Sequence, residues 1–296
     1  MVWRGGGGEL GFINMPDRYD VPLNIGTLFL FSTSGSQSSM EKHNQALRAL
    51  GVNAVYFTFN RPISAQAYAD LLRSPIARGG AVTGQGLKSG IIPAVDEIDE
   101  LAGSVNAINT VINKDGRLYG YNTDVYGLEA ALRKHLGVSG ITVKKAVIYG
   151  NGGVSGVAAH VLKSLGIEVT MAGRNPERVD KKMSDLGLSG FPGPYDLVVN
   201  ATPVSAAPLA EAVGLFNILQ DCKMVFDHNM PEKDNKINYL QNYCEENKLY
   251  FIPGKAMYIP QMIKQWTLFL DGIEDDEGNR IKITEEDIMK NWGIKI

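Results

Sequence analysis

Residues 144–166 read KKAVIYGNGGVSGVAAHVLKSLG, and this stretch decides the class of fold. An apolar run, a glycine-rich turn and an amphipathic segment predict a buried strand, a tight loop and a helix in immediate succession. Gly150, Gly152 and Gly153 allow the backbone to turn sharply and approach a pyrophosphate, which the unpaired N–H groups of the next helix would bind. The third position of the usual fingerprint holds Ser155 instead of glycine, so a tight structural turn is the alternative.

The strand that follows, EVTMAGRNPER at 168–178, discriminates between the two nicotinamide dinucleotides. An NAD site usually places a carboxylate at the end of this strand, about 20 residues past the glycines, to bind the ribose 2′-hydroxyl. Here the strand end carries Gly173 and Arg174, with Arg178 one helical turn further on. Because a guanidinium pairs bidentately with phosphate oxygens, the pattern favours NADP, unless both arginines are solvated surface charges. The candidate cofactor contacts in the glycine-rich loop are Gly150, Asn151, Gly152, Gly153 and Val154.

Alternating strand-like and helix-like segments occupy the chain on both sides of this unit. The first series begins near residue 26 and contains LFLF, MEKHNQALRALG, NAVYFTF and ISAQAYADLLRS, and the second begins near residue 143. Such alternation with short connections predicts βαβ units in an α/β fold with mostly parallel sheets. Between the two series, NAINTVINKDGRLYGYNTD at 106–124 predicts a β-hairpin that turns at Asp115 and Gly116. We expect a long helix at 257–270 and, after it, a short helix capped by Thr284.

The composition fits a two-domain protein of enzyme size, with 296 residues of which 44% are hydrophobic. The formal net charge is -3 and the basic residues are interspersed with acidic ones, so we expect no nucleic-acid partner. Cys222 and Cys244 lack metal-ligand spacing and the four histidines are scattered, so we expect reduced thiols and no metal. No apolar run reaches the roughly 18 residues that span a bilayer, and no signal-like core is present. We therefore expect a cytoplasmic protein without a membrane partner.

Lys88 and Asp124 are the candidate catalytic residues, in the half of the chain that lacks the glycine-rich loop. Lys88 precedes a helical pattern in GLKSGIIPAVDEIDELA, and Asp124 ends YNTD at a strand-to-helix corner. An aspartate at such a corner suits either a plain N-cap or half of an active site. Short polar side chains that suit a polyhydroxylated small molecule cluster around the pair in sequence, namely Thr83, Asn109, Asn122 and Thr123.

These motifs together resemble the shikimate dehydrogenase family, including its quinate/shikimate and shikimate-dehydrogenase-like branches. The resemblance runs from about residue 44 to 270 and is sharpest in AINT, DGRLYGYNTDVYG, IYGNGGVSG, DLVVNATP and PGKAMYIPQ. It implies an N-terminal α/β substrate domain, a Rossmann NADP domain and a C-terminal helix that returns to the first domain. We accordingly expect domains at 1–124 together with 256–296, and at 125–255. The resemblance also implies NADP-dependent, reversible reduction of 3-dehydroshikimate to shikimate, in the biosynthesis of chorismate and aromatic amino acids, by a monomer or homodimer.

Carried over position by position, the resemblance implies roles for individual residues. Lys88 matches the catalytic lysine, which would stabilise and protonate the oxygen that gains charge when hydride reaches the carbonyl, and Asp124 matches its partner. The implied substrate contacts are Ser39, Thr83, Asn109 and Gln261. The implied cofactor contacts beyond the loop are Arg174, Asn200, Ala201, Thr202, Gly254 and Met257.

The chain departs from the family pattern in the segment that binds the substrate carboxylate. The family carries SxSP before His-Asn, whereas residues 37–40 here are QSSM, so only Ser39 remains, with Ser34 or Ser36 as substitutes. The NVTxPxK stretch reads AVTGQGLK, with one extra residue and no proline. Three readings therefore stay open: a shikimate dehydrogenase, a quinate dehydrogenase or paralogue acting on a related cyclic hydroxy acid, and a non-catalytic protein that binds NADP or a metabolite.

Overall fold

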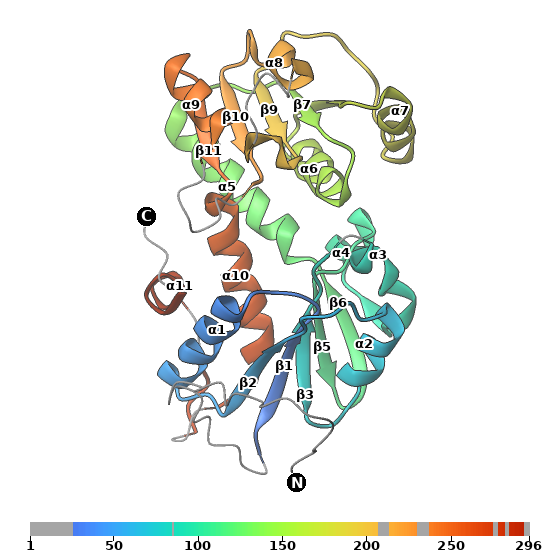
Figure 1. Ribbon diagram of the computed structural model, residues 1–296, viewed down its shortest axis with the longest axis vertical. Coiled ribbons are helices and arrows are strands. Elements are labelled where there is room, and N and C mark those ends of the chain that lie inside the picture. The colour runs from blue at the N-terminus through green and yellow to red at the C-terminus, as the bar shows by residue number, and fades with distance from the viewer. Residues whose placement is uncertain are drawn as a thin grey trace, which may run out of the picture.

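The computed structural model describes residues 26–84, 86–206, 213–229, 237–274, 278–281 and 284–292. These residues form two lobes, one above the other in Figure 1, and each lobe is built on its own sheet. The lower lobe holds the first sheet and the upper lobe holds the second. The architecture is therefore α/β with two sheets, as the alternating sequence pattern predicts.

The first sheet has six strands in the order β2-β1-β3-β5-β6-β4. Its strands are β1 (Leu28–Ser32), β2 (Ala54–Thr58), β3 (Ala77–Ala81), β4 (Glu97–Ile98), β5 (Thr110–Lys114) and β6 (Arg117–Tyr121). Parallel pairing joins β1 to β2 and β3, and β4 to β6, whereas β5 is antiparallel to both its neighbours. The predicted hairpin is confirmed as β5–β6, and it turns at Asp115 (φ 52°) and Gly116 (φ 85°). Positive φ at both positions is what a two-residue type I′ turn requires.

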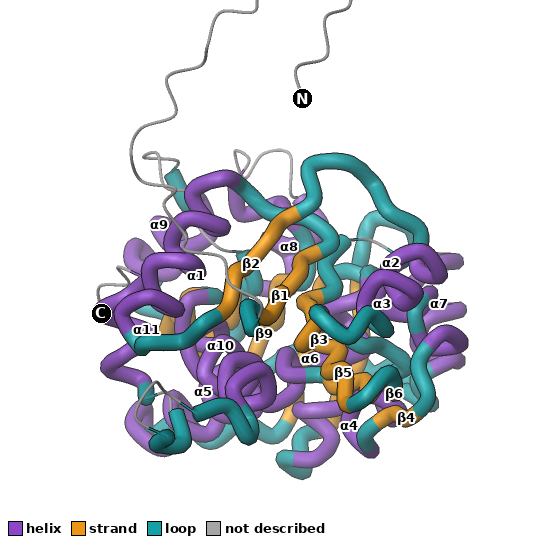
Figure 2. Tube along the Cα trace, turned by 90° about the horizontal axis from the view of Figure 1, so that it is seen from below, coloured by secondary structure: helices purple, strands orange, loops and turns teal. Residues whose placement is uncertain are grey.

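Helices cover both faces of the first sheet. Those of this lobe are α1 (Gln37–Ala49), α2 (Ala65–Leu72), α3 (Leu87–Gly90) and α4 (Glu100–Val105), with a 3-10 turn at Ile92–Ala94. In Figure 2, α1 lies on one side of the strands and α2 on the other. Along β1, Leu30 packs with the cluster under α1 while Phe31 packs with the cluster under α2. This alternation follows from the two-residue period of a strand whose two faces are both buried.

The second sheet is fully parallel, in the order β11-β10-β9-β7-β8. Its strands are β7 (Lys145–Tyr149), β8 (Glu168–Ala172), β9 (Leu197–Asn200), β10 (Met224–Asp227) and β11 (Tyr250–Pro253). Its helices are α6 (Gly153–Ser164), α7 (Pro176–Asp185), α8 (Val213–Leu219) and α9 (Tyr239–Glu246), with a 3-10 turn at Pro203–Ala206. The strand order reverses between β7 and β9. In doubly wound, Rossmann-like sheets, ligands bind in the crevice at the carboxyl ends of the two strands at such a switch point.

Two long helices, α5 (Thr123–Ser139) and α10 (Lys255–Leu270), run between the lobes and pack against each other. They approach closely at Gly127, where an added Cβ would lie 2.6 Å from the carbonyl oxygen of Met257. The lower part of α10 packs on the first sheet through Trp266 and Phe269, so the chain returns to the first lobe. The last helix, α11 (Glu285–Trp292), lies against α1. The Thr284 hydroxyl accepts the N–H of Asp287 at 3.2 Å, which confirms the predicted cap.

Candidate active site

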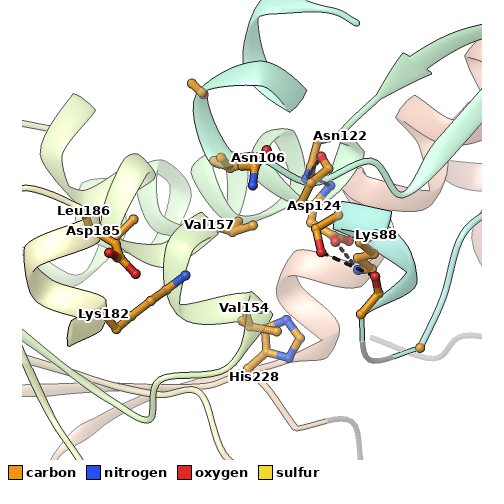
Figure 3. Close-up of a pocket in the computed structure, with 17 residues that line it drawn as sticks. Lys88, Asn106, Asn122, Asp124, Val154, Val157, Lys182, Asp185, Leu186 and His228 are labelled. Carbon is orange, nitrogen blue, oxygen red and sulfur yellow. Dashed lines mark hydrogen bonds and ion pairs between the residues drawn. The ribbon is translucent and has the colours of Figure 1, made fainter. Parts of the chain in front are cut away.

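A cavity of about 630 Å³ lies between the two lobes. Lys88, Asn106 and Asp124 line it from the first lobe and the start of α5, while Val154, Val157 and His228 line it from the second lobe (Figure 3). The glycine-rich loop before α6 and the two predicted catalytic residues therefore border one space. A cavity of this size, with several polar groups in its wall, suits a small-molecule ligand.

Lys88 and Asp124 form an ion pair in the wall of this cavity. The Nζ atom of Lys88 lies 2.5 Å from Oδ2 of Asp124, and the two side chains are 32% and 18% exposed. Lys88 sits on the short helix α3, and its carbonyl oxygen accepts the N–H of Ile108 at 2.7 Å. This bond joins α3 to the segment before β5, so Lys88 is held beside the start of the β5–β6 hairpin.

The N-cap of α5 is Asn122, not Asp124. The side-chain oxygen of Asn122 accepts the N–H groups of Asp124 and Val125 at 3.0 and 3.2 Å, and its amide nitrogen donates to Ala107 O at 2.8 Å. Asn122 therefore satisfies two of the free N–H groups at the start of the helix. Asp124 lies within the first turn, where the helix dipole favours a carboxylate, and its oxygens are free to face Lys88.

The surroundings of Asp124 keep its carboxyl ionised. Burial alone raises the pKa of Asp124, but the Lys88 ammonium lowers it, and His228 and a hydrogen bond with Asn109 act in the same direction. The lowering contributions outweigh the burial, so the pKa of Asp124 lies below its ordinary value. At neutral pH the Asp124 side chain is therefore a carboxylate, and it accepts a hydrogen bond from Lys88.

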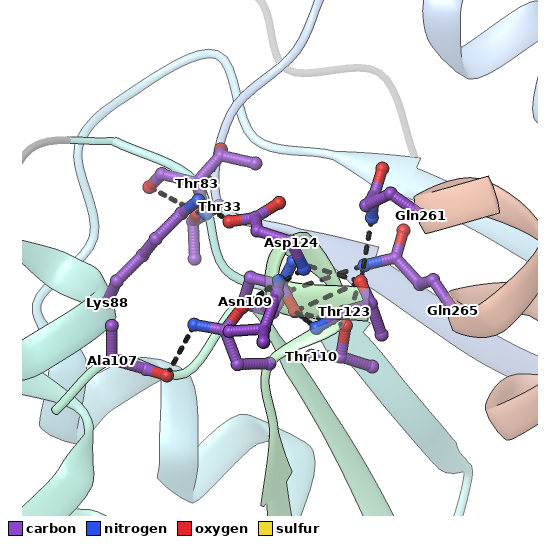
Figure 4. Close-up of polar contacts among 12 residues, drawn as sticks. Thr33, Thr83, Lys88, Ala107, Asn109, Thr110, Thr123, Asp124, Gln261 and Gln265 are labelled. Carbon is purple, nitrogen blue, oxygen red and sulfur yellow. Dashed lines mark hydrogen bonds and ion pairs between the residues drawn. The ribbon is translucent and has the colours of Figure 1, made fainter. Parts of the chain in front are cut away.

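A buried polar network lies behind Asp124 and is centred on Thr123 (Figure 4). Asn109 donates to the Thr123 hydroxyl at 2.9 Å and accepts the N–H of Thr123 at 2.9 Å. Gln261 of α10 also donates to the Thr123 hydroxyl, at 2.8 Å, and Gln265, one turn later, donates to Thr110 at 2.8 Å. The network fixes the first turn of α5 and therefore the position of Asp124. Asn109 and Gln261 lie in this network, beside the cavity and not in its wall.

Three hydroxyl groups meet where β1 and β3 end. The Thr83 hydroxyl lies 2.5 Å from that of Ser34 and 3.2 Å from that of Thr33. Ser39 lies apart from this group, in the first turn of α1, where its N–H donates to the hydroxyl of the N-cap Ser36 at 3.1 Å. The structure therefore places Ser34, one of the two possible substitutes, beside Thr83.

The glycine-rich loop has the geometry of a site for a phosphate group. Gly150 has φ +118°, and a Cβ there would lie 2.6 Å from Thr202, so only glycine fits against the end of β9. Added Cβ atoms at Gly152 and Gly153 would meet open space, and no side chain caps the N-terminus of α6. Among the first N–H groups of this twelve-residue helix, that of Ser155 donates to Gly152 O at 3.1 Å, and those of Gly153 and Val154 are available to an anion. Asn151 lies in the same loop, and Gly153 and Val154 border the cavity.

The ends of the neighbouring strands complete the second-lobe side of the site. The buried Asn200 donates to Thr202 O at 3.1 Å and to Asp227 at 2.9 Å, and it accepts the Thr202 hydroxyl at 2.7 Å. This places Ala201 and Thr202 against Gly150 at the switch point between β7 and β9. At the start of α10, a Cβ on Gly254 would lie 2.7–2.9 Å from three carbonyl oxygens at and just after the end of β10, and Met257 is buried one turn later.

Arg174 and Arg178 lie outside the cavity, at the end of β8 and in the first turn of α7. Both are exposed, and no salt bridge found among the described residues involves either side chain. Asn175 caps α7 between them by accepting the N–H of Arg178 at 3.0 Å. The two guanidinium groups therefore stand near the edge strand next to β7, where the ribose end of a dinucleotide on the glycine-rich loop would lie.

The side chains of the cavity wall that sequence reasoning missed include Asn106, Lys182 and His228. Asn106 ends α4 in the left-handed conformation (φ 50°), and Lys182 reaches the cavity from α7. His228 directly follows β10, and this position at the carboxyl end of a parallel strand was the signal that could have identified it. Within the described ranges, no group of three or more His, Cys, Asp or Glu side chains is arranged to hold a metal ion. The described helices also include none with the length and apolarity needed to cross a membrane.

Comparison with known proteins indicates the family of this chain. A family model described as the shikimate dehydrogenase substrate binding domain matches residues 34–111. The NADP(+)-dependent shikimate dehydrogenase of Halothermothrix orenii is 32% identical over 194 residues, which cover 59% of this chain and 66% of that protein. The chain thus spans slightly less than two thirds of that relative. The enzyme of the same name from Clostridium botulinum is 32% identical over 199 residues, which cover 63% of this chain and 74% of that protein.

A solved structure shares the fold over nearly the whole chain. The shikimate 5-dehydrogenase of Thermus thermophilus, in complex with NADP(H) and shikimate, superposes with a TM-score of 0.68 at 24% identity. The superposition covers 90% of this chain and 98% of that one. The fold is thus shared with this enzyme, and the 32% identity to the Clostridium botulinum protein over 74% of its length shows that the chain belongs to the shikimate dehydrogenase family.

Proposed function

We propose that this protein is an NADP-dependent shikimate dehydrogenase that reversibly reduces 3-dehydroshikimate to shikimate. The observation that carries the proposal is the 2.5 Å ion pair between Lys88 and Asp124 in the wall of a cavity that the glycine-rich loop borders from the other lobe. A proton donor and a dinucleotide site that face one space are what a carbonyl reduction requires. Family membership supports the same activity.

The roles of the two catalytic residues follow from their charges. The Lys88 ammonium would hydrogen-bond the carbonyl oxygen, stabilise the negative charge that develops there and supply the proton. Asp124, whose pKa is lowered beside Lys88, would hold the ammonium in place and accept a hydrogen bond from a neighbouring substrate hydroxyl. Asn109 and Gln261 would act through Thr123, by fixing the turn that carries Asp124. In the reverse direction, Lys88 would accept the proton.

NADP would be held by the second lobe, and it would supply the hydride. The free N–H groups of α6 and the open space at Gly152 and Gly153 fit its pyrophosphate. Arg174 and Arg178 would bind the 2′-phosphate, with Asn151 and Val154 lining the loop. The residues proposed near the nicotinamide are Asn200, Ala201, Thr202, Gly254 and Met257. This assignment divides the chain into a substrate unit at 1–124 with 256–296 and a cofactor unit at 125–255.

Recognition of the substrate carboxylate would differ from the usual two-serine arrangement. We assign it to the hydroxyls of Ser34 and Thr83, which lie 2.5 Å apart, with Ser39 on the adjacent turn. This altered set of hydroxyl side chains favours one alternative, a quinate dehydrogenase or paralogue that acts on a related cyclic hydroxy acid. A non-catalytic binding protein would have no use for a paired proton donor in its cavity.

One spectrophotometric assay tests the proposal. NADP+ reduction at the nicotinamide band should proceed with shikimate and be slower with quinate, and replacing NADP+ by NAD+ should lower kcat/KM at least tenfold. A higher kcat/KM for quinate or another cyclic hydroxy acid would favour the paralogue. Binding of both ligands without any absorbance change would establish a non-catalytic protein.

A further inference from the structure

His228 occupies a position that the proposed mechanism does not use. It is the first residue after β10, and its backbone N–H donates to Asn200 O at 3.0 Å. On its other side, its carbonyl oxygen lies 2.8 Å from the position of a Cβ on Gly254. The backbone of His228 is therefore fixed between the end of β9 and the start of α10, and the direction of its Cα–Cβ bond is fixed with it.

The imidazole of His228 points into the cavity between the lobes and faces the catalytic pair of the other lobe. It lines the cavity together with Lys88, Asp124 and Val154 (Figure 3). Apart from a contact with its own backbone, the ring bonds to no other residue in the described part of the chain. A histidine with a purely structural role would be expected to bond to its neighbours, whereas this ring presents its nitrogen atoms to the space where a ligand would bind.

Burial of the ring favours its neutral form. Burial lowers the pKa of His228, Asp124 raises it, Lys88 lowers it and Asp227 raises it, and the net result is a pKa below the ordinary histidine value. A neutral imidazole has one N–H donor and one nitrogen acceptor, so it complements a hydroxyl group, which also donates and accepts. It would add no positive charge to that of Lys88.

We propose that His228 is a substrate-binding residue supplied by the cofactor lobe, whose ring hydrogen-bonds the substrate hydroxyl next to the reacting carbon. The inference rests on the proposed function and extends it. Asp124 binds the hydroxyl side of the substrate from the first lobe, and His228 binds it from the second. A substrate whose carbon ring carries this hydroxyl is therefore held from both sides of the cavity. A substrate that lacks the hydroxyl is bound less tightly.

The test compares His228→Ala and His228→Gln with the wild type. Shikimate affinity is measured by calorimetry in the presence of NADP+, NADP+ affinity is measured alone, and kcat and KM are measured for both. His228→Ala should weaken shikimate binding and raise its KM about tenfold, while NADP+ affinity changes less than about twofold. His228→Gln retains one donor and one acceptor, so it should recover part of the loss. His160→Ala, on α6 outside the cavity wall, is the matched control and should leave all values unchanged.

A shikimate analogue that lacks the hydroxyl next to the reacting carbon identifies the contact. The wild type should bind this analogue about tenfold more weakly than shikimate, and in His228→Ala this difference should be clearly smaller, because only the Asp124 contact to that hydroxyl remains. An active wild type with unchanged shikimate affinity in His228→Ala would overturn this inference alone. The inference would also be overturned if His228→Ala weakened the binding of shikimate and of the analogue equally, or weakened the binding of NADP+ instead. A wild type that neither binds nor turns over shikimate or a relative would overturn the proposed function as well.

Discussion

At the level of single residues, the Lys88–Asp124 pair depends on polar groups that hold the first turn of α5 in place. Asn122 caps α5, Asn109 and Gln261 hold Thr123, and these contacts leave the Asp124 carboxylate directed at Lys88. The pair is only partly exposed, so its charges are less screened than those of a surface salt bridge. The geometry of the pair therefore depends on these supporting residues as well as on Lys88 and Asp124 themselves.

Removal of either member of the pair should abolish most turnover without affecting the cofactor. We expect Lys88→Ala and Asp124→Ala to lower kcat by about 10²- to 10⁴-fold, because the proton donor or its partner is lost. The NADP+ dissociation constant should stay within about twofold, since the glycine-rich loop lies on the other lobe. Lys290→Ala, at an exposed lysine of α11, serves as the control. Near-normal kcat in both cavity variants would refute the assignment.

The two exposed arginines after β8 should govern the choice of dinucleotide. In an Arg174→Ala/Arg178→Ala variant we expect NADP+ to bind at least about tenfold more weakly, since two charge-assisted contacts to the 2′-phosphate are lost. NAD+, which lacks this phosphate, should bind as before. Fluorescence titration with each dinucleotide measures both values, and an equal loss for the two would show that the arginines serve the fold instead.

His43 should make the stability of the protein depend on pH. It is buried and stacked against Tyr56 and Trp266, with ring centroids at 4.1 and 5.5 Å. Burial, with Lys42 in addition, lowers the pKa of His43 from 6.5 to about 3. Between these pH values the unfolded chain binds a proton at this site and the folded protein does not. Stability is therefore lost as pH falls below about 6.5, by about 1.4 kcal/mol per pH unit.

A His43→Phe variant isolates this contribution, because phenylalanine retains a flat ring between Tyr56 and Trp266 but does not titrate. Urea unfolding of both proteins at several values between pH 6 and pH 4 gives the two slopes. The slope of the variant should be shallower than that of the wild type by about 1.4 kcal/mol per pH unit. Parallel slopes would mean that His43 is protonated in the folded protein.

At the level of elements, β3 and the two-residue β4 were the parts of the first sheet that sequence analysis did not predict, and β3 is the central one of the two. Its sequence, ARGGA, lacks the β-branched and aromatic residues typical of a strand, yet it lies between β1 and β5. A Cβ on Gly79 would collide with the Val111 carbonyl, and one on Gly80 with the Tyr68 hydroxyl, which itself bonds to Ala81 O at 3.0 Å. The strand is held by its neighbours, and glycine is present because they leave no room for a side chain.

A methyl group in β3 should therefore be costly. We expect Gly80→Ala to lower the free energy of unfolding by about 2 kcal/mol or more, because Tyr68 must give up its buried position or its hydrogen bond. Gly103→Ala in α4, where an added Cβ meets open space, is the matched control and should be neutral or slightly stabilising. Urea denaturation measures both. Equal stability of the two variants would show that β3 accommodates a side chain.

At the level of the whole molecule, α5 and α10 set how the two lobes face each other. Both run between the lobes, and α5 carries Asp124 while α10 begins at the Gly254 turn, so each helix links the two sides of the cavity. Their contact at Gly127 is tight, with 2.6 Å between an added Cβ and either Gln261 Cβ or Met257 O. A small separation of the helices would therefore change the distance between the Lys88–Asp124 pair and the glycine-rich loop.

Gly127→Ala should consequently impair catalysis and stability together. The methyl group pushes α5 from α10, so we expect kcat/KM for shikimate to fall about tenfold or more and the melting temperature to drop. Gly137→Ala lies in the same helix, where a Cβ meets open space, and should retain wild-type kcat/KM. Steady-state kinetics and thermal unfolding measure the two effects. Wild-type kcat/KM in Gly127→Ala would exclude a role of this contact in lobe geometry.

The sequence by itself determined the features that depend on neighbours along the chain. The strand, loop and helix at 144–166, the turn at Asp115 and Gly116, and the cap at Thr284 each follow from the residues inside the segment. The candidate pair Lys88 and Asp124 was also identified from sequence, through motifs that resemble a family. Periodicity and turn chemistry are local properties, so they can be read without knowledge of the fold.

Only the tertiary structure decided which distant residues meet. It assigned the cap of α5 to Asn122, placed Ser34 beside Thr83, inserted a glycine strand into the first sheet and turned His228 toward the opposite lobe. Each outcome joins residues that are far apart in sequence or depends on the space left by packed neighbours. The space around a residue depends on how all the elements pack together and not on any one segment. It therefore cannot be predicted from the local sequence pattern.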